Sequence, residues 1–437
     1  MRLIQKVIEL CRRVEGRGEL NYFIQNDKID NVEFVFPALR GFENILTGKK
    51  LIDIPRIVSR ICGLCHTSQS IASCKAIEEL YGVEPSFQST MIRKVLMTAE
   101  LIKSHIIHFF FHCFPDLLEL FSIKKLNMNN FNIINLDPQL TSNVYDLIKT
   151  GTEINNIFGG RIIHLITTTP GGVVYKPSKK NLMIVKRYLQ KAFTNIDYIL
   201  QKYVDLFSEK EPPEDFDLPN INLLGMLNNG HYNRYNGNLH IIKSDGNEIE
   251  FDISNYENYF TKDINLFGIK FLTLSDNKPI LTGPIARYNL SRNNCQSMYN
   301  SLLKYFDTRW KKNILFVNFI QLLEIYNEVN NSIDMLENHN LDNQETLPTL
   351  NKIVKQDGIG NVEAPRGTLV HHYHLNKLNI VDNVKLYIPT EINFPFLNEN
   401  IKKYAQKLYE KEDIQSVNKK VQRMVRAFDP CIACATH

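Results

Sequence analysis

Two cysteine pairs are the residues of this sequence whose type and spacing best suit chemistry. The first is Cys62 and Cys65, in the run Arg60-Ile61-Cys62-Gly63-Leu64-Cys65, and the second is Cys431 and Cys434, just before His437. A C-x-x-C spacing lets two sulfur atoms point into one site, and four thiolates select zinc, iron–sulfur clusters, or nickel and iron. Zinc ribbons place their pairs about 15–20 residues apart. Nearly the whole chain separates these pairs, which disfavours a zinc ribbon but leaves a structural zinc ion as an alternative.

The composition excludes several other classes of protein. The chain has 437 residues and a net charge of +4, without a basic cluster interleaved with aromatic residues, so nucleic-acid binding is disfavoured. No run approaches the ~20 apolar residues of a membrane span, and residues 1–6 are too charged for a secretory signal. We therefore expect a cytoplasmic location, or a periplasmic one only if a partner subunit carries an export signal. The single cysteines are expected to be small buried residues: Cys11, Cys74, Cys113 and Cys295.

Hydrophobic periodicity predicts an α+β fold that is mainly helical. Alternating residues on both sides of Asn26-Asp27-Lys28 predict a β-hairpin over residues 19–37. Helical spacing begins near Pro55, and one apolar face runs from Ile92 to Phe109 until Pro115, which is expected to end that helix. Two further helices and a second hairpin with an Asp-Gly turn are expected over residues 182–207, 293–336 and 239–251.

We expect one domain over residues 1–437, because neither a repeat nor a low-complexity linker is visible. A helical core over about 55–210 and 290–437 would surround a β-rich insertion at about 220–285. The N-terminal hairpin at about 19–37 would complete this unit.

The flanks of the cysteine pairs resemble a known family. R-x-C-G-x-C near the N-terminus and D-P-C-x-x-C-x-x-H at the C-terminus are similar to the two motifs of [NiFe]-hydrogenase large subunits. Further matches follow in the family's order along the whole chain: Arg13–Gly16, Arg40–Glu43, Glu363–Gly367, and Pro389-Thr390 followed by Asn393. The related protein of respiratory complex I shares the fold but lacks the four cysteines. The resemblance therefore implies a catalytic subunit that cleaves or forms H2, with the large-subunit fold.

The resemblance implies a nickel–iron centre held by the four paired cysteines. All four would bind nickel, and Cys65 and Cys434, the second of each pair, would also bridge to iron. The family's iron carries CO and two cyanides, which need hydrogen-bond donors in a water-free pocket. Arg366 and Thr390 match positions that face the cyanides, and Pro365, in the same motif as Arg366, belongs to this predicted binding set. Arginine suits the role because it stays charged and donates from a fork.

Catalytic roles are implied in the same way. Heterolytic cleavage of H2 needs a Lewis-acidic metal and a base. Cys431 matches the thiolate that first accepts the proton, and Glu15 matches the family's proton gate. The alternative for Glu15 is a surface salt bridge with Arg13 or Arg17. Arg366 is a secondary candidate base, which Asp429 would orient.

A second metal site is implied by Glu43 and His437, which match the family's buried magnesium or iron site. A carboxylate suits Mg2+, whereas an imidazole is a less usual ligand, so Mg2+ and Fe2+ both stay open. One departure is Gln69, where the family commonly has histidine; glutamine can still hydrogen-bond near a bridging sulfur but cannot titrate. Three histidines at helical spacing are expected to support the structure and not to bind metal: His105, His108 and His112.

A partner is expected, because all paired cysteines are assigned and the single ones are too scattered for an iron–sulfur cluster. An iron–sulfur small subunit, with further electron-transfer subunits, would carry the electrons away. The alternative functions are an H2-sensing regulatory subunit with the same site and low turnover, and a structural metal protein. Many relatives lose a C-terminal extension at the position of His437, so we expect either a matured chain or one made without the extension. Both place His437 inside the protein.

Overall fold

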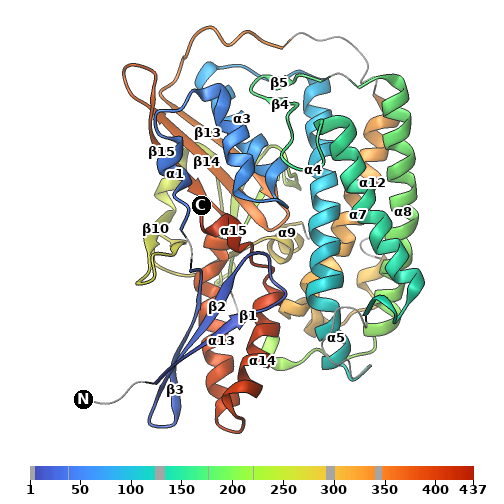
Figure 1. The fold of residues 1–437 in the computed structure, drawn as a ribbon, viewed down its shortest axis with the longest axis vertical. Coiled ribbons are helices and arrows are strands. Elements are labelled where there is room, and N and C mark those ends of the chain that lie inside the picture. The colour runs from blue at the N-terminus through green and yellow to red at the C-terminus, as the bar shows by residue number, and fades with distance from the viewer. Residues whose placement is uncertain are drawn as a thin grey trace.

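Four long helices form one side of the molecule (Figure 1). The computed structural model describes residues 5–37, 39–123, 133–175, 177–219, 221–291, 301–339 and 347–437. The long helices are α4 (Phe87–Ile107), α7 (Pro138–Gly159), α8 (Lys179–Phe207) and α12 (Val317–Asn338). Side-chain oxygens cap three of them, because Ser86, Asp137 and Ser178 each accept a backbone N–H from the first turn. No helix among the described residues is both long and apolar enough to cross a bilayer.

The helix through Ile92 and Phe109 does not end at Pro115, so that prediction is wrong. α4 gives way to a π-helical turn at His108–Cys113, and α5 (Phe114–Leu120) continues with Pro115 in its first turn. Proline is tolerated there because the amide of a first-turn residue has no partner within the helix. The extra residue of a π turn changes which side chains face the core.

The helix predicted over residues 293–336 is also shorter than expected. α12 begins only at Val317, after the short helices α11 (Thr308–Lys311) and η6 (Ile314–Phe316). Asp307 and Asn313 cap these two segments through their side chains, and such caps start new helices instead of continuing one. Residues 292–300, and with them Cys295, lie outside the described residues.

The predicted N-terminal hairpin is confirmed as part of a larger sheet. β2 (Gly18–Gln25) and β3 (Lys28–Val35) pair antiparallel, and Asn26 and Asp27 both have positive φ in the turn between them. β1 (Gln5–Cys11), which the sequence analysis did not identify, pairs with β2. The sheet packs against α13 (Pro389–Tyr409), which is followed by α14 (Ile414–Ala427) and α15 (Ile432–Ala435).

A second antiparallel sheet lies against helix α3 (His66–Tyr81). Its strands are β13 (Asp357–Ala364), β14 (Gly367–Leu375) and β15 (Val381–Tyr387). Gly358 and Gly360 allow the close approach, since a Cβ at either position would lie 2.1 Å from a carbonyl oxygen of α3. Pro365 and Arg366 form the two-residue turn between β13 and β14. Figure 1 shows this sheet and α3 beside the C-terminus.

The predicted β-rich segment in the middle of the chain forms two further sheets. β8 (Asn238–Ile242) and β9 (Glu248–Phe251) are the expected second hairpin, which is confirmed. β6 (Asn222–Asn228) pairs with β8 and, in parallel, with β12 (Ile280–Thr282); β7 (His231–Tyr232) pairs with β6. β10 (Phe260–Ile264) and β11 (Lys270–Leu274) form a separate pair, and α9 (Pro284–Leu290) follows β12.

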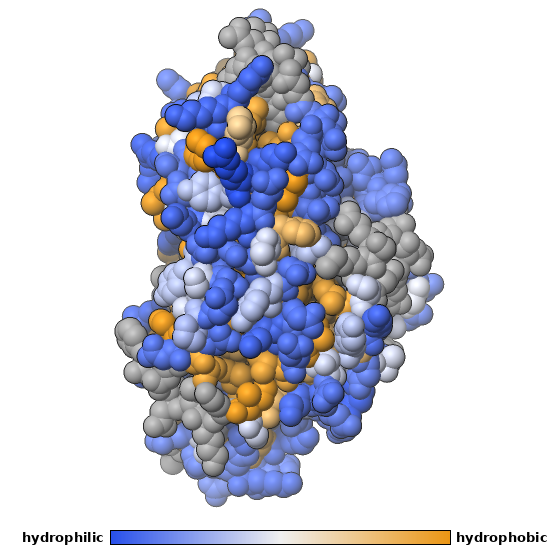
Figure 2. All heavy atoms as spheres, turned by 90° about the vertical axis from the view of Figure 1, so that its right-hand side faces the viewer, coloured by the Kyte–Doolittle hydropathy of each residue, from blue (hydrophilic) through white to orange (hydrophobic). Residues whose placement is uncertain are grey.

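Short elements complete the fold. They are α1 (Phe42–Leu46), η1 (Leu51–Asp53), α2 (Ile54–Val58), η2 (Ser59–Ile61), β4 (Thr168–Thr169), β5 (Gly172–Val173), η4 (Glu214–Phe216) and η5 (Ile253–Asn258). The fold class is α+β and mainly helical, as predicted. The surface on the side of the long helices is mostly hydrophilic, with apolar side chains gathered in its lower half (Figure 2).

Candidate metal centre

The four paired cysteines meet at one buried point. Cys62 and Cys65 lie between η2 and α3, Cys431 directly precedes α15, and Cys434 lies within it. Their sulfur atoms all lie within 4.8 Å of one another, with Cys62 Sγ 3.4 Å from Cys431 Sγ. Each side chain is at most 3% exposed. The arrangement matches the prediction that both ends of the chain contribute to one site.

The sulfur cluster has the chemistry of a soft-metal site. Hydrogen bonds from the other three thiols, that of Cys431 first, lower the pKa of Cys62 well below its usual range. Burial raises the pKa of Cys431 and Cys434 well above theirs. Loss of the protons of Cys431 and Cys434 is therefore unfavourable unless positive charge is bound nearby, and a metal ion would supply that charge. Four buried sulfur donors fit nickel and iron, so the residues present suit the predicted centre.

Glu15 lies beside this cluster and not in a surface salt bridge. Its Oε2 is 3.1 Å from Cys431 Sγ and accepts the N–H of Ala433 at 3.0 Å, and its carbonyl oxygen accepts the N–H of Ile432. Burial, together with the neighbouring Cys62 thiolate, raises the pKa of Glu15. The expected alternative partners bond elsewhere, since Arg13 pairs with Asp116 and Arg17 with Glu19.

Arg366 reaches the sulfur atoms from the turn between β13 and β14. Its Nη1 lies 3.3 Å from Cys65 Sγ and donates to Ser104 Oγ at 3.1 Å. Its Nε and Nη2 donate to Asp429 at 2.8–3.1 Å, to both a carbonyl and a carboxylate oxygen. The Arg366 guanidinium lowers the pKa of Asp429 against the opposing effect of burial. Arg366 thus brings a fixed positive charge to the cluster, and Asp429 orients it.

The other two residues of the predicted cofactor-binding set are placed differently. Thr390 Oγ1 accepts the backbone N–H of Cys431 at 3.0 Å, which leaves the hydroxyl hydrogen available to a ligand. The carbonyl oxygen of Pro365 accepts from Arg287 at 2.9 Å. Whether Arg366, Thr390 and Pro365 contact a bound group stays a prediction.

Glu43 and His437 are brought together as expected. His437 is fully buried; its Nδ1 lies 3.0 Å from Cys434 O, and its Nε2 lies 3.5 Å from Glu43 Oε1. A ring nitrogen held by a backbone carbonyl typically leaves the other nitrogen to ligate a metal. Nε2 has no hydrogen-bond partner among the described residues. A buried imidazole nitrogen in this position, beside a carboxylate, fits a divalent cation.

Two lysines that the sequence analysis missed also contact Glu43. Lys270 Nζ pairs with Glu43 Oε2, and Lys262 Nζ lies 3.2 Å from Glu43 Oε1 and 3.6 Å from Glu391. These cations, with His437, lower the pKa of Glu43 despite its burial. Lys262 lies on β10 and Lys270 on β11, about 220 positions after Glu43 in the chain. No local sequence pattern therefore predicted that they would contact Glu43.

Gln69 and the three histidines at helical spacing are the other polar residues for which the sequence predicts a role. Gln69 Oε1 accepts from His371 of β14 at 2.7 Å, and whether its amide N–H donates near the predicted bridging sulfur stays a prediction. His105 bonds Glu324 at 2.9 Å. His108, His112 and Asp429 also place potential ligand atoms within 4.8 Å of one another, but the two nitrogens of His108 bond Gln321 and a backbone carbonyl at 2.7 Å. These hydrogen bonds agree with the prediction that His105 and His108 support the structure, and the absence of metal binding there stays a prediction.

Comparison with known proteins supports the site. The family model for nickel-dependent hydrogenases matches residues 40–216 and 287–437. An F420-non-reducing hydrogenase vhc subunit of Methanococcus voltae is 28% identical, covering 98% of this chain and 94% of the relative. The NAD-reducing hydrogenase HoxS subunit beta of Cupriavidus necator is 25% identical, covering 99% of this chain and 94% of the relative. The crystal structure of an NAD+-reducing [NiFe]-hydrogenase in the H2-reduced state is similar over 100% of this chain and 100% of its own chain, with a TM-score of 0.92 at 23% identity.

The chain therefore belongs to the nickel-dependent hydrogenase family. It has the function of the catalytic large subunit of a [NiFe] hydrogenase, an oxidoreductase that acts on H2. The sequence-based prediction of this family and activity is confirmed.

Proposed function

We propose that this chain splits H2 into protons and electrons, reversibly, at a nickel–iron centre held by its four paired cysteines. The observation that carries this proposal is the meeting of four buried sulfur atoms within 4.8 Å, with a carboxylate 3.1 Å from one of them. When bound, the centre supplies Lewis acidity and accepts electrons. We infer that its iron carries CO and two cyanides, toward which Arg366 and Thr390 would donate hydrogen bonds and beside which Pro365 would lie.

Glu15 is proposed to carry protons away from the sulfur of Cys431. Burial raises the pKa of this carboxyl, which favours its uptake of a proton from the sulfur before the proton is passed on. The Glu15 side chain is half-buried, so its carboxyl group can contact both the sulfur of Cys431 and the solvent. Arg366 would stabilise negative charge at Cys65 without titrating, and Asp429 would keep it in place.

Glu43 and His437 are proposed to hold Mg2+ or Fe2+ at a separate site. Support comes from His437 Nε2, which lies beside the Glu43 carboxylate and has no hydrogen-bond partner within the described part of the chain. Bound metal would fix His437, which follows Cys434 by three positions. Lys262 and Lys270 neutralise the Glu43 carboxylate in this structure, so a bound cation would compete with them for it.

A partner with iron–sulfur clusters is proposed to receive the electrons. The relatives above are themselves named as subunits, which supports a multisubunit complex. A surface for the partner is offered by Ile162, Ile163 and Ile166, which are 39–51% exposed. The same segment reaches the first cysteine pair, because His164 Nδ1 lies 2.9 Å from Ser59 O and its ring lies 5.8 Å from that of His66. Exposed apolar residues beside a redox centre suit docking of an electron acceptor.

Metal analysis and turnover test this proposal together. The purified complex should contain nickel and iron, show CO and CN infrared bands, and reduce an artificial electron acceptor with H2. Zinc in place of nickel would contradict the proposed centre and restore the structural-metal alternative. The H2-sensing alternative is not favoured, because the relatives above are named as hydrogenases, one of them NAD-reducing. The cytoplasmic location stays a prediction for cell fractionation.

A further inference from the structure

The three carbonyl groups that precede Arg366 all accept hydrogen bonds from buried arginines. Arg234 Nε donates to the oxygen of Glu363 at 3.3 Å. Arg287 donates to the oxygens of Ala364 at 3.1 Å and Pro365 at 2.9 Å. The backbone that leads into Arg366 is thus held at three successive peptide groups.

Arg287 has the larger share of these contacts. It lies on α9 and is 1% exposed. Besides the two carbonyls, it donates to Glu324 through Nε and Nη2, both at 2.7 Å, and to Glu363 through Nη1 at 3.1 Å. Guanidinium has five N–H donors in a rigid fork, and lysine could not reproduce these five contacts. The fork therefore fixes the turn relative to α9 and α12.

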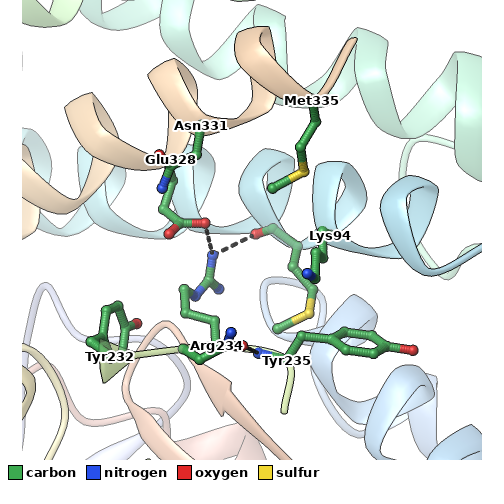
Figure 3. A pocket seen from close by; sticks show the side chains of 9 residues that line it. Lys94, Tyr232, Arg234, Tyr235, Glu328, Asn331 and Met335 are labelled. Atoms are coloured by element: carbon green, nitrogen blue, oxygen red, sulfur yellow. Dashed lines mark hydrogen bonds and ion pairs between the residues drawn. The ribbon is translucent and has the colours of Figure 1, made fainter. Parts of the chain in front are cut away.

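Arg234 holds the same strand from a second direction. Its backbone carbonyl accepts the N–H of Glu363 at 2.9 Å, and its Nη1 donates to Met97 O at 3.3 Å and lies 3.4 Å from Glu328. Figure 3 shows Arg234 reaching up to Glu328. Both residues line a cavity of about 110 Å³. None of the four cysteines lines this cavity.

Helix α12 supplies the counter-charges for both arginines. Glu324 and Glu328 are four positions apart, so they lie on one face of the helix. His105 on α4 adds a contact to Glu324, which joins the two long helices to the cluster. The start of α9 also packs closely against the backbone of Arg366. A Cβ on Gly283 (φ +104°), directly before α9, would lie 2.7 Å from the carbonyl oxygen of Arg366.

We propose that Arg287, assisted by Arg234, is a positioning residue that sets where the Arg366 guanidinium meets the metal centre. Arg366 Nη1 is only 3.3 Å from Cys65 Sγ, so a small shift of its backbone would change that contact and its donation toward a bound ligand. The sequence motifs around the cysteines do not include the residues that hold this turn, which are Arg234, Arg287, Glu324 and Glu328. This inference rests on the proposed function, because the ligand that Arg366 faces belongs to that proposal.

The test compares Arg287→Lys with Arg93→Lys in the complete hydrogenase complex. Arg93 is a matched control: it is fully buried, pairs with Glu78 through both Nη atoms, and donates to the carbonyls of Thr169 and Gly172. Both variants lose a buried guanidinium fork and should lower Tm. Only Arg287→Lys should shift or broaden the CN infrared bands and reduce turnover at least about tenfold while nickel content is kept. Unshifted bands in Arg287→Lys, or equal shifts in both variants, would overturn the proposal.

Glu324→Gln covers the case in which Arg287→Lys does not accumulate with metal. Glutamine keeps the shape but loses one charged acceptor, so the fork should loosen and the CN bands should shift in part. Bands identical to those of the wild type would then refute the positioning role. A wild-type complex without CO or CN bands would instead refute the proposed function.

Discussion

Glu15 Oε2 lies 3.1 Å from the sulfur of Cys431, although the two residues are 416 positions apart in the chain. The contact is fixed by backbone, because Glu15 and Cys431 form an isolated bridge and Ile432 donates to the Glu15 carbonyl. Gly16 makes this approach possible, since it has φ +87° and a Cβ there would meet Ile432 at 2.9 Å. The carboxyl group is therefore held against one particular sulfur of the site.

Glu15→Gln should block proton transfer without removing the metals. Glutamine keeps the size and the N–H contact from Ala433 but cannot titrate. General acid–base groups contribute about 10²–10⁴-fold, so H2/D2 exchange and turnover should fall by at least about 100-fold. Nickel content and infrared bands should match those of the wild type. Exchange kinetics that are unchanged would rule out this role.

Cys65→Ala and Cys434→Ala should each abolish nickel incorporation, because each removes one of the four proposed ligands, whose sulfur atoms lie within 4.8 Å of one another. Cys74→Ala is the matched control. That residue is also fully buried, but it stands alone, and burial raises its thiol pKa to about 12, so it stays protonated. It should keep nickel and lose only about 1 kcal/mol of stability. Stoichiometric nickel in either ligand variant would contradict the assignment.

Glu100 should make stability depend on pH. It is buried on α4 and accepts the N–H groups of Thr67 and Ser68 at the start of α3, directly after Cys65. Burial raises its pKa from 4.5 to about 7. The folded state therefore binds this proton more tightly than the unfolded chain. The resulting stabilisation is complete below pH 4.5 and is lost as the pH rises to about 7.

Glu100→Gln should remove this pH dependence. As the pH rises from about 4.5 to about 8, the free energy of unfolding of the variant should increase relative to that of the wild type, by up to about 3 kcal/mol. The Tm of the variant should rise relative to that of the wild type over the same range. Thermal unfolding across this range measures the effect. Glu248→Gln, at an exposed position, is the control and should leave the pH profile unchanged. A pH-independent difference for Glu100→Gln would show that this carboxyl does not titrate there.

A permanent peptide extension after His437 should prevent closure of the site. His437 is fully buried, and its N–H donates to Cys434 O at 3.3 Å, so added residues have no room beside the sulfur cluster. We expect loss of nickel and a lower Tm, with recovery when a protease removes the extension before metal is supplied. The same peptide placed before Met1 should be tolerated better. Full activity with a permanent extension would show that burial of His437 is not required.

The sequence by itself identified the four cysteines that meet in the structure and the order of the motifs that carry the family resemblance. A C-x-x-C spacing constrains its two sulfur atoms locally, and the residues flanking Cys62 and Cys431 carry the family resemblance whatever the rest of the chain does. Hairpins with Asn-Asp and Asp-Gly turns were also predictable, because their register is set by the turn residues.

Only the tertiary structure decided the partners of those residues. Lys262 reaches Glu43, Arg287 reaches Pro365 and His371 reaches Gln69 across 78 to 302 positions of chain. Such contacts depend on sheet register and on how helices pack, and no short sequence pattern encodes either. The same limit explains the errors at Pro115 and at the start of α12, where a π turn and two capping side chains outweighed hydrophobic periodicity.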